Sequence, residues 1–270
     1  MHIAPTAAAL IAAFAVWLTA AGVSPGTVRL RRHYLGRLAD VYPDLTAVTP
    51  GDLAAFLAHH GWAPETRKSA RASVRVFYAW ASDEGHLPAD PSRRLPPIRV
   101  PRPLPRPVPL RVFTQALLRA DVRGARALLL IRYAGLRRAE VAAVHTDHVL
   151  ELGDGTTGLL VHGKGAKVRV VPLHPKVAGA LAGQRGWLFP SDRTESGHIT
   201  PDSLGELASD LLGPDWSGHT LRRRAASDWY AVERDLRAVQ ELLGHASIAT
   251  TQIYTAPPPG AAARAVLGVA

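Results

Sequence analysis

Cysteine is absent from the 270 residues of the chain. Its absence excludes a disulfide framework and any metal centre built on thiolates, and it fits a reducing cytoplasm. Lysine is scarce as well, because only four of the 32 basic residues are Lys and the other 28 are Arg. The guanidinium group prefers planar oxyanions, above all phosphate, so this bias favours a phosphate-bearing partner.

Acidic residues are too few to balance the basic ones, and the formal net charge is +10. Such a chain gains affinity for a polyanion by releasing bound counterions, whatever the polyanion's sequence. Nucleic acid is therefore the leading partner, and an anionic membrane surface is the alternative.

Long hydrophobic runs are missing too, and only residues 7–21 have to be weighed as a targeting signal. This stretch is long enough for the core of a signal peptide but short for a membrane span. The three residues that precede the apolar region, Met1-His2-Ile3, lack the Lys or Arg of a signal peptide. The bulky side chains recur at helical spacing on one face, which predicts an N-terminal core helix: Leu10, Phe14, Trp17 and Leu18.

Residues 1–86 are predicted to form a helical domain of four helices. A capping residue or a first-turn proline stands at the start of the later helices, at Ser24-Pro25, Thr49-Pro50 and Ala63-Pro64. The fourth helix carries a basic stripe that is either a DNA-binding face or a solvated one: Arg67, Lys68, Arg71 and Arg75.

Residues 87–109 are rich in proline and contain five Arg. Proline removes backbone donors and blocks helix formation, so this stretch is predicted to be a stiff interdomain linker. Its charge suggests that Arg99, Arg102 and Arg106 lie along a phosphate backbone. A plain solvated spacer is the alternative.

Residues 110–256 are predicted to form the second domain, followed by a tail at 257–270. Helical patterns lead to two strands, 159–162 and 168–171, which flank a Gly-rich tip and so predict a β-hairpin. The segment from Pro201 onward is predicted to be helical. The expected fold class is therefore mainly α with a small antiparallel β-sheet.

Six residues of this second domain suggest phosphoryl transfer. Arg137 stands in G-L-R-R-A-E, Lys164 in H-G-K-G, and His219 and Arg222 in H-T-L-R; His245 and Tyr254 bound the run H-A-S-I-A-T-T-Q-I-Y. Two guanidiniums can clamp a phosphodiester, a phenol can attack phosphorus, and Lys and His can move protons. Ser217 is predicted to cap the helix that presents His219 and Arg222 on one face.

Two other interpretations of this domain, a nucleotide-binding loop and a metal centre, are disfavoured by the sequence. Gly158 to Lys164 spells the start of a Walker A loop, but Gly165 stands where Mg²⁺ binding needs Ser or Thr, and the Lys opens a hairpin instead of a helix. The remaining histidines, including His145 and His148, lack the Cys or carboxylate pattern of a metal centre. No metal and no nucleotide cofactor is expected.

The order and spacing of the six residues resemble the tyrosine site-specific recombinases, the family of phage integrases and Xer-type resolvases. The resemblance implies that Arg137 and Arg222 bind the phosphate, with Glu140 in support. It also implies that Lys164 protonates the departing 5′ oxygen. His219 and His245 would then act as proton or hydrogen-bond partners, and Tyr254 as the nucleophile. The N-terminal domain would be the SAM-like core-binding domain of that family.

The same resemblance implies the partners. The chain would act on double-stranded DNA recombination sites, as a homo-tetramer on synapsed DNA and a monomer free in solution, without a membrane. An accessory directionality factor is a candidate further partner, the tail at 257–270 is expected to dock on a neighbouring subunit, and the location would be the cytoplasm, at the nucleoid when DNA is bound.

Two alternatives remain open from the sequence. A type IB topoisomerase uses similar residues but reseals the same strand, and a non-catalytic DNA-binding regulator would keep the fold without the chemistry. One departure from the family concerns the site itself, because Arg223 stands where members commonly carry His after the second arginine.

Overall fold

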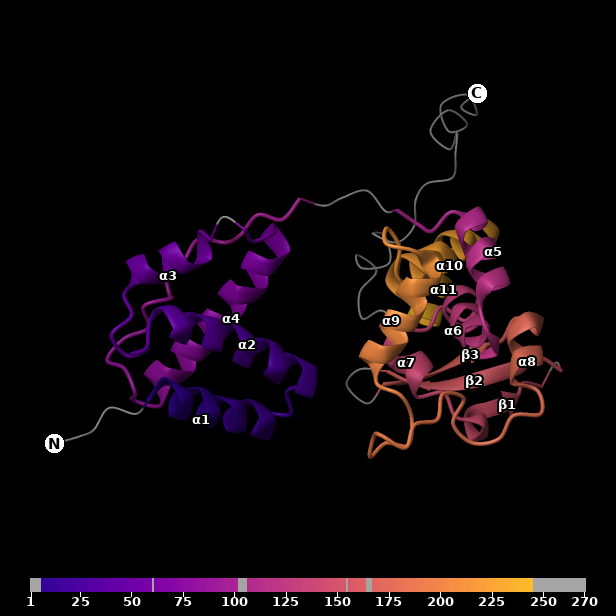
Figure 1. Ribbon diagram of the computed structural model, residues 1–270, viewed down its shortest axis with the longest axis horizontal. Helices are drawn as coiled ribbons and strands as arrows, with labels where there is room; N and C mark the ends of the chain where they lie inside the picture. Colours follow the sequence, from indigo (N-terminus) through magenta and orange to yellow (C-terminus); the bar gives the residue numbers. More distant parts are fainter. Residues whose placement is uncertain (1–5, 60, 102–105, 154, 164–166, 245–270) are drawn as a thin grey trace, which may run out of the picture. The chain divides into compact units, whose positions relative to one another are not determined.

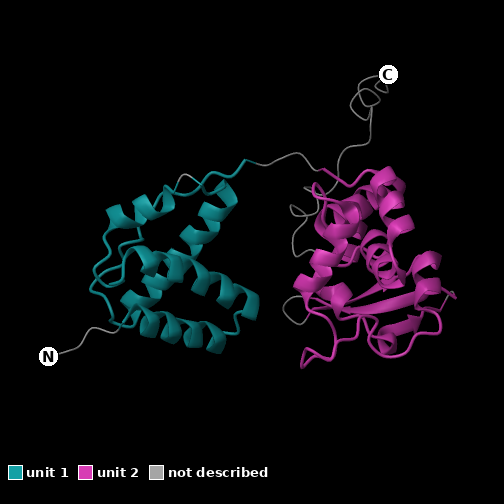
Figure 2. Ribbon diagram, viewed as in Figure 1, with its two compact units in different colours: residues 1–102 teal, residues 103–270 magenta. Residues whose placement is uncertain are grey.

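The computed structural model describes residues 6–59, 61–101, 106–153, 155–163 and 167–244 (Figure 1). The chain divides into two compact units, Met1–Arg102 and Pro103–Ala270 (Figure 2). The division falls within the stretch 87–109 for which the sequence predicts a linker. Each unit has its own hydrophobic core.

The first unit is helical in its described part. Its helices are α1 (Ala7–Ala20), α2 (Pro25–Val41), α3 (Pro50–Leu57) and α4 (Pro64–Asp83). A proline in the first turn starts α2, α3 and α4, where its missing N–H has no helical partner to lose. The four predicted helices are confirmed.

Helix α1 supplies the centre of the first core. Phe14 is fully buried, and its ring lies 5.4 Å from that of Phe77 and 5.2 Å from that of Trp80, both on α4. The apolar stretch at residues 7–21 is thus a core helix, as predicted. Among the described residues, no helix combines the length and the apolar character needed to cross a membrane.

Both ends of the proline-rich stretch are anchored. Leu87 and Leu95 are buried in the first core, and the Leu95 carbonyl accepts a hydrogen bond of 2.6 Å from Arg71 Nη2. At the other end Val108 is fully buried in the second core, and its N–H donates to the Thr220 carbonyl at 3.4 Å. The segment between Leu95 and Val108 is therefore shorter than the linker predicted at 87–109.

The second unit combines helices with one small sheet. Its elements are α5 (Leu110–Arg119), α6 (Val122–Tyr133), α7 (Arg138–Ala142), the short η1 (Thr146–His148), β1 (Val149–Glu151), β2 (Thr157–His162), β3 (Val168–Pro172), α8 (Pro175–Leu181), α9 (Pro201–Leu212), α10 (Gly218–Glu233) and α11 (Leu236–Leu243). Strand β1 and helix α8 were not predicted from the sequence.

The sheet is antiparallel in the order β1-β2-β3. Leu159 pairs with Val171 and Val161 pairs with Arg169, so the predicted hairpin is confirmed in this register. Leu159, Val161 and Val171 are buried and belong to the core of the unit. Because cross-strand partners share a face, Arg169 also lies on the face of the sheet that meets the helices.

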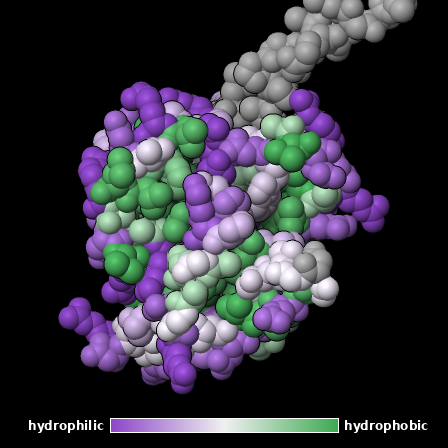
Figure 3. Space-filling view, turned by 90° about the vertical axis from the view of Figure 1, so that its right-hand side faces the viewer, coloured by the Kyte–Doolittle hydropathy of each residue, from purple (hydrophilic) through white to green (hydrophobic). Residues whose placement is uncertain are grey.

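Apolar side chains also reach the surface of the second unit. Leu118 and Val122 are 81% and 68% exposed. Figure 3 shows the side of the unit that bears α5 and α8, where hydrophobic side chains form separate clusters divided by hydrophilic ones. Scattered exposure of this kind is normal for a protein surface.

A cavity made by removing a buried ring should strongly destabilise the first unit. We expect Phe14→Ala to lower its free energy of unfolding by about 3–5 kcal/mol, because a fully buried aromatic ring is removed. Val16→Ala on the same helix is the control; Val16 is 70% exposed, so its loss should change the value by less than about 0.5 kcal/mol. Urea unfolding measures both, and equal effects of the two substitutions would contradict the packing of α1.

Candidate active site

Helix α10 presents His219 and Arg222. Ser217 caps it, since its Oγ accepts a hydrogen bond of 3.4 Å from the Thr220 N–H, so the predicted cap is confirmed. Arg222 is 2% exposed. Its guanidinium donates to the Gly135 carbonyl and, at 2.6 Å, to the Leu243 carbonyl.

Arg137 comes from the turn between α6 and α7. Gly135 takes a φ of +60°, and a Cβ atom there would lie 2.5 Å from the ring of Trp229, so only glycine fits this turn. Arg137 follows as the N-cap of α7, and its side chain is 38% exposed. Its Nη2 donates to the Gly244 carbonyl at 3.0 Å.

The carboxylate of Glu140 holds the arginines together. It accepts a hydrogen bond of 2.7 Å from Arg137 Nη1 and one of 2.8 Å from the Arg137 backbone N–H. Arg169 grips it with two parallel bonds, Nη1 to Oε1 and Nη2 to Oε2, each 2.9 Å long. Arg222 Nη1 lies 3.6 Å from Oε2. One buried acid is thus surrounded by three guanidiniums.

The electrostatics of Glu140 follow from this environment. Burial by itself raises the pKa of its carboxyl group. Hydrogen bonds from Arg169 and the Arg137 backbone, with the charges of Arg169 and Arg222, outweigh burial and lower the pKa to about 2. Glu140 is therefore an anion at neutral pH, where it binds the arginines and does not exchange protons.

Three successive carbonyls at the end of α11 accept hydrogen bonds from the same arginines. Leu242 accepts from Arg169 Nε at 2.9 Å, while Leu243 and Gly244 accept from Arg222 and Arg137. The last carbonyls of a helix have no partner inside it and carry partial negative charge. Gly244 ends α11 in the left-handed conformation, with φ of +63°.

A cavity of about 720 Å³ opens beside the arginines. Arg137, Arg138, His219 and Arg222 line it. Carboxylates of α9 at four-residue spacing line it as well: Asp202, Glu206 and Asp210. An anion that entered the cavity would be drawn to the arginines.

His219 stands exposed at this cavity with a perturbed ring. The pKa of its imidazole is lowered, first because part of the ring is removed from water. The positive charges of Arg223, Arg222 and Arg137 lower it further, because they repel the positive charge of a protonated ring. A neutral ring results, which can accept a proton or a hydrogen bond. Arg223, the departure from the family pattern, thus acts on the site through its charge.

The hairpin tip begins next to Glu140. The Gly163 N–H donates to the Lys167 carbonyl at 2.7 Å, which closes the loop that contains Lys164. A Cβ atom on Gly163 would lie 3.8 Å from Glu140 Oε1. Three of the predicted catalytic residues lie outside the described residues, namely Lys164, His245 and Tyr254. The described chain neighbours of Lys164 and His245 are Gly163 and Gly244, and both lie beside Arg169.

Arg169 belongs to the site but was not predicted from the sequence. It stands in a predicted strand among apolar residues, two positions before Val171. Because side chains two residues apart in a strand share a face, this spacing was the one sign that Arg169 faces the core. Its partner Glu140 stands 29 residues earlier in the chain, so no local pattern connects the two.

The predicted DNA-binding residues differ in their surroundings. Lys68 and Arg75 are exposed, whereas Arg67 Nε donates to the Trp62 carbonyl at 3.0 Å and Arg71 is bound to Leu95. Arg99 and Arg106 are exposed, and Arg102 lies outside the described residues.

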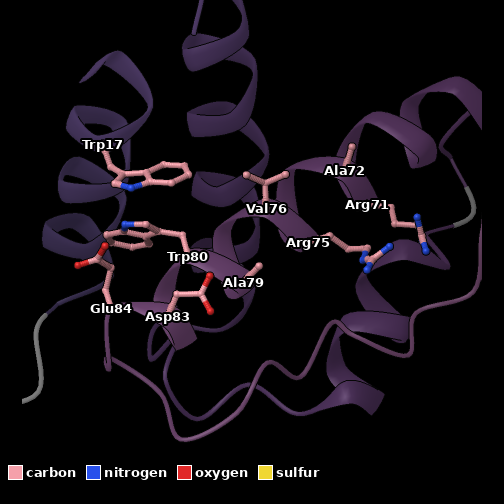
Figure 4. A pocket seen from close by; sticks show the side chains of 9 residues that line it. All are labelled: Trp17, Arg71, Ala72, Arg75, Val76, Ala79, Trp80, Asp83 and Glu84. Atoms are coloured by element: carbon pink, nitrogen blue, oxygen red, sulfur yellow. The ribbon is translucent and has the colours of Figure 1, made fainter. Parts of the chain in front are cut away.

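Arg71 and Arg75 also line a hollow on the first unit. Figure 4 shows it between α1 and α4, with the two arginines at one end and Trp17, Trp80, Asp83 and Glu84 at the other. The stripe of α4 is thus partly a structural element of the unit, and Lys68 and Arg75 are its most accessible charges.

In the part of the chain that is described, no group of three or more His, Asp or Glu side chains is arranged to hold a metal ion.

Comparisons with known proteins agree with this geometry. The model of the phage integrase family matches residues 111–259. The chain is 35% identical to the tyrosine recombinase XerD of Caulobacter vibrioides, over 83% of this chain and 81% of the relative. It is 34% identical to the tyrosine recombinase XerC of a Methylobacterium species, over 93% and 90%.

Solved structures share the fold. A lambda integrase dimer bound to a COC′ core site is similar with a TM-score of 0.72 and 18% identity, over 93% of this chain and 77% of that one. The XerH site-specific recombinase bound to palindromic difH substrate gives a TM-score of 0.66 and 20% identity, over 89% and 77%.

The low pKa of Glu140 predicts a pH dependence of stability. Its folded value of about 2 lies below the ordinary value of 4.5. The stabilisation is therefore complete above the ordinary value and is lost as the pH falls from about 5 towards about 2. Urea unfolding at a series of pH values should show a shallower acid loss for Glu140→Gln than for the unchanged protein. Glu241→Gln, which removes an exposed carboxylate of α11, should keep the original slope; parallel curves for all three proteins would contradict this prediction.

Proposed function

Since the chain belongs to the phage integrase family and is a tyrosine recombinase, an enzyme that cuts and rejoins DNA, we propose that it recombines specific DNA sites through a 3′-phosphotyrosine intermediate at Tyr254. The observation that carries the proposal is the pair Arg137 and Arg222, held on one buried carboxylate beside a cavity that also presents His219. Two fixed guanidiniums are suited to the non-bridging oxygens of a phosphodiester.

In the proposed reaction the Tyr254 phenolic oxygen attacks phosphorus and the bond from phosphorus to the 5′ oxygen breaks. A neutral His219 accepts a hydrogen bond or the phenolic proton, Lys164 donates a proton to the departing 5′ oxygen, and His245 supports the phosphate. The 5′ hydroxyl of the partner strand then attacks the phosphotyrosine and releases the phenol. The ester conserves the energy of the broken bond, so rejoining requires no nucleotide.

The assembly is part of the same proposal. Double-stranded recombination sites are the partners, in line with the DNA-bound lambda integrase and XerH structures. Four protomers of an otherwise monomeric protein would synapse two sites, in the cytoplasm and at the nucleoid. An accessory factor would set direction. Residues 257–270 would dock on a neighbouring subunit, because the stiff run Pro257-Pro258-Pro259 precedes an apolar segment too short to fold alone.

DNA contacts outside the site are proposed for the first unit and the connecting stretch. The exposed side chains of Lys68, Arg75, Arg99 and Arg106 support such contacts. Arg67, Arg71 and Arg102 complete the proposed surface.

The nucleophile is tested by Tyr254→Phe, which removes only the phenolic oxygen. We expect the variant to bind a recombination site normally and to form no covalent adduct on a nicked suicide substrate, whereas the unchanged protein is trapped on it. Full adduct formation by Tyr254→Phe would remove the central claim. An unchanged protein that binds but is never trapped would indicate a non-catalytic regulator, and relaxation of supercoils at arbitrary sequences would indicate a type IB topoisomerase.

The clamp is tested by Arg137→Ala beside a variant of an exposed arginine. Arg137→Ala should lower single-turnover cleavage by at least about 10²-fold, as expected when one preorganised donor to a developing charge is lost. Arg237 is the control, because it is exposed, pairs with Glu241 at 3.5 Å on α11 and does not line the cavity. Arg237→Ala should cleave within about threefold of the unchanged protein. Similar losses in the two variants would show that Arg137 has no special role.

A further inference from the structure

Arg169 joins three elements of the second unit through one side chain. It stands on β3, its side chain is 13% exposed, and it grips both oxygens of Glu140 on α7. Its remaining polar nitrogen, Nε, donates to the Leu242 carbonyl at the end of α11. A single planar group thus fixes the distances between the hairpin, the turn of Arg137 and the end of α11.

Two glycines enclose this guanidinium. A Cβ atom on Gly244 would lie 2.9 Å from Arg169 Nη1 and 3.1 Å from its Cζ, closer than packing permits. A Cβ atom on Gly163 would lie 3.7 Å from the same Nη1. Gly163 is followed by Lys164 and Gly244 by His245, so the last described residue before each of these two predicted catalytic residues lies beside Arg169.

Arg169 also saturates the carboxylate. An ionised carboxylate offers about four acceptor positions. Arg169 fills two of them, and Arg137 fills two through Nη1 and its backbone N–H. With its acceptors occupied, Glu140 keeps Arg222 Nη1 at 3.6 Å and does not draw it closer. Loss of Arg169 would open two acceptor positions beside the two clamp arginines.

We propose that Arg169 is a positioning residue for strand cleavage, which sets the clamp arginines through Glu140 and anchors the end of α11 from which the segment of Tyr254 departs. This inference rests on the proposed function. Arg169 is not assigned to the phosphate, because it does not line the cavity that presents Arg137, His219 and Arg222, and its guanidinium faces Glu140 and Leu242. Its effect on the reaction passes through other residues.

The test compares variants in single-turnover cleavage of a suicide substrate, beside site binding and thermal melting. Arg169→Gln should bind DNA normally but cleave about 10- to 100-fold more slowly, the usual effect of losing a group that orients a reactive one. Arg169→Lys keeps the charge but cannot grip Glu140 in the bidentate manner and reach Leu242 as well, so it should restore only part of the rate. Arg237→Gln is the matched control, since Arg237 pairs with Glu241 on the exposed face of α11, and it should cleave like the unchanged protein.

A pH profile separates positioning from general structural damage. Without Arg169, the buried Glu140 loses the partner that most favours its charged form, so its pKa rises and it should take up a proton at a higher pH than in the unchanged protein. Arg137 and Arg222 remain the charged groups that face it. Cleavage by Arg169→Gln should therefore fall on the acid side more steeply than cleavage by the unchanged protein. The Glu140→Gln/Arg169→Gln double variant, which has no such proton to gain, should lack the extra fall.

The outcomes are distinct. If the unchanged protein forms no adduct at Tyr254, the proposed function fails. If it does and Arg169→Gln cleaves at its rate, the positioning role alone is overturned. A rate that drops equally at every pH, or an acid fall that persists in the double variant, also overturns it. If Arg169→Gln does not fold, the cleavage rate and its pH profile are compared in two other variants. Arg169→Lys keeps the positive charge, and the double variant makes the buried pair neutral.

Discussion

The second unit depends on one buried carboxylate. Glu140 is 7% exposed, and an acid removed from water in this way is stable as an anion only when it is paired and hydrogen-bonded on all sides. Arginines from the N-cap of α7, from β3 and from α10 meet this requirement, and each of them must therefore reach the same point. The cluster sets the relative positions of the elements more strictly than apolar packing does, because a hydrogen bond has a direction and a fixed length.

The same arginines solve a second problem, that of the end of α11. Its last carbonyls would otherwise lack partners, and the guanidiniums at Leu242, Leu243 and Gly244 supply them. The positive ends of the clamp and the negative end of the helix thus stabilise one another. The segment from His245 onward begins where this contact ends, which ties the proposed nucleophile to the groups proposed to bind its target.

The sequence predicted what local patterns encode. The helix starts at Pro25, Pro50 and Pro64 and the Ser217 cap follow from rules that span a few residues, and the structure confirms them. Arg169 could not be found in this way, because its importance depends on Glu140 in another element. Strand β1, which has three residues, was not predicted either, because an alternation so short carries almost no signal.

Other features needed tertiary context for the same reason. The proline-rich stretch looks uniform in the sequence, yet Leu95 and Val108 are buried in different cores. From the sequence alone, an apolar residue among prolines does not show whether it is buried, or in which core. The basic stripe of α4 is similar, since the sequence gives four charges at helical spacing but not the carbonyls of Trp62 and Leu95 that engage two of them.

The residue after Arg222 shows how one side chain changes the proton chemistry of the site. A histidine at that position would lose its charge near neutral pH, whereas the guanidinium of Arg223 stays charged. Burial and this charge act in the same direction on the pKa of His219, and both lower it. The positive charge of the site thus lies on guanidiniums, and the lowered pKa of His219 favours its neutral form. In the proposed reaction, an imidazole that begins without a proton can take one from the attacking phenol, so the donation to the departing 5′ oxygen falls to Lys164.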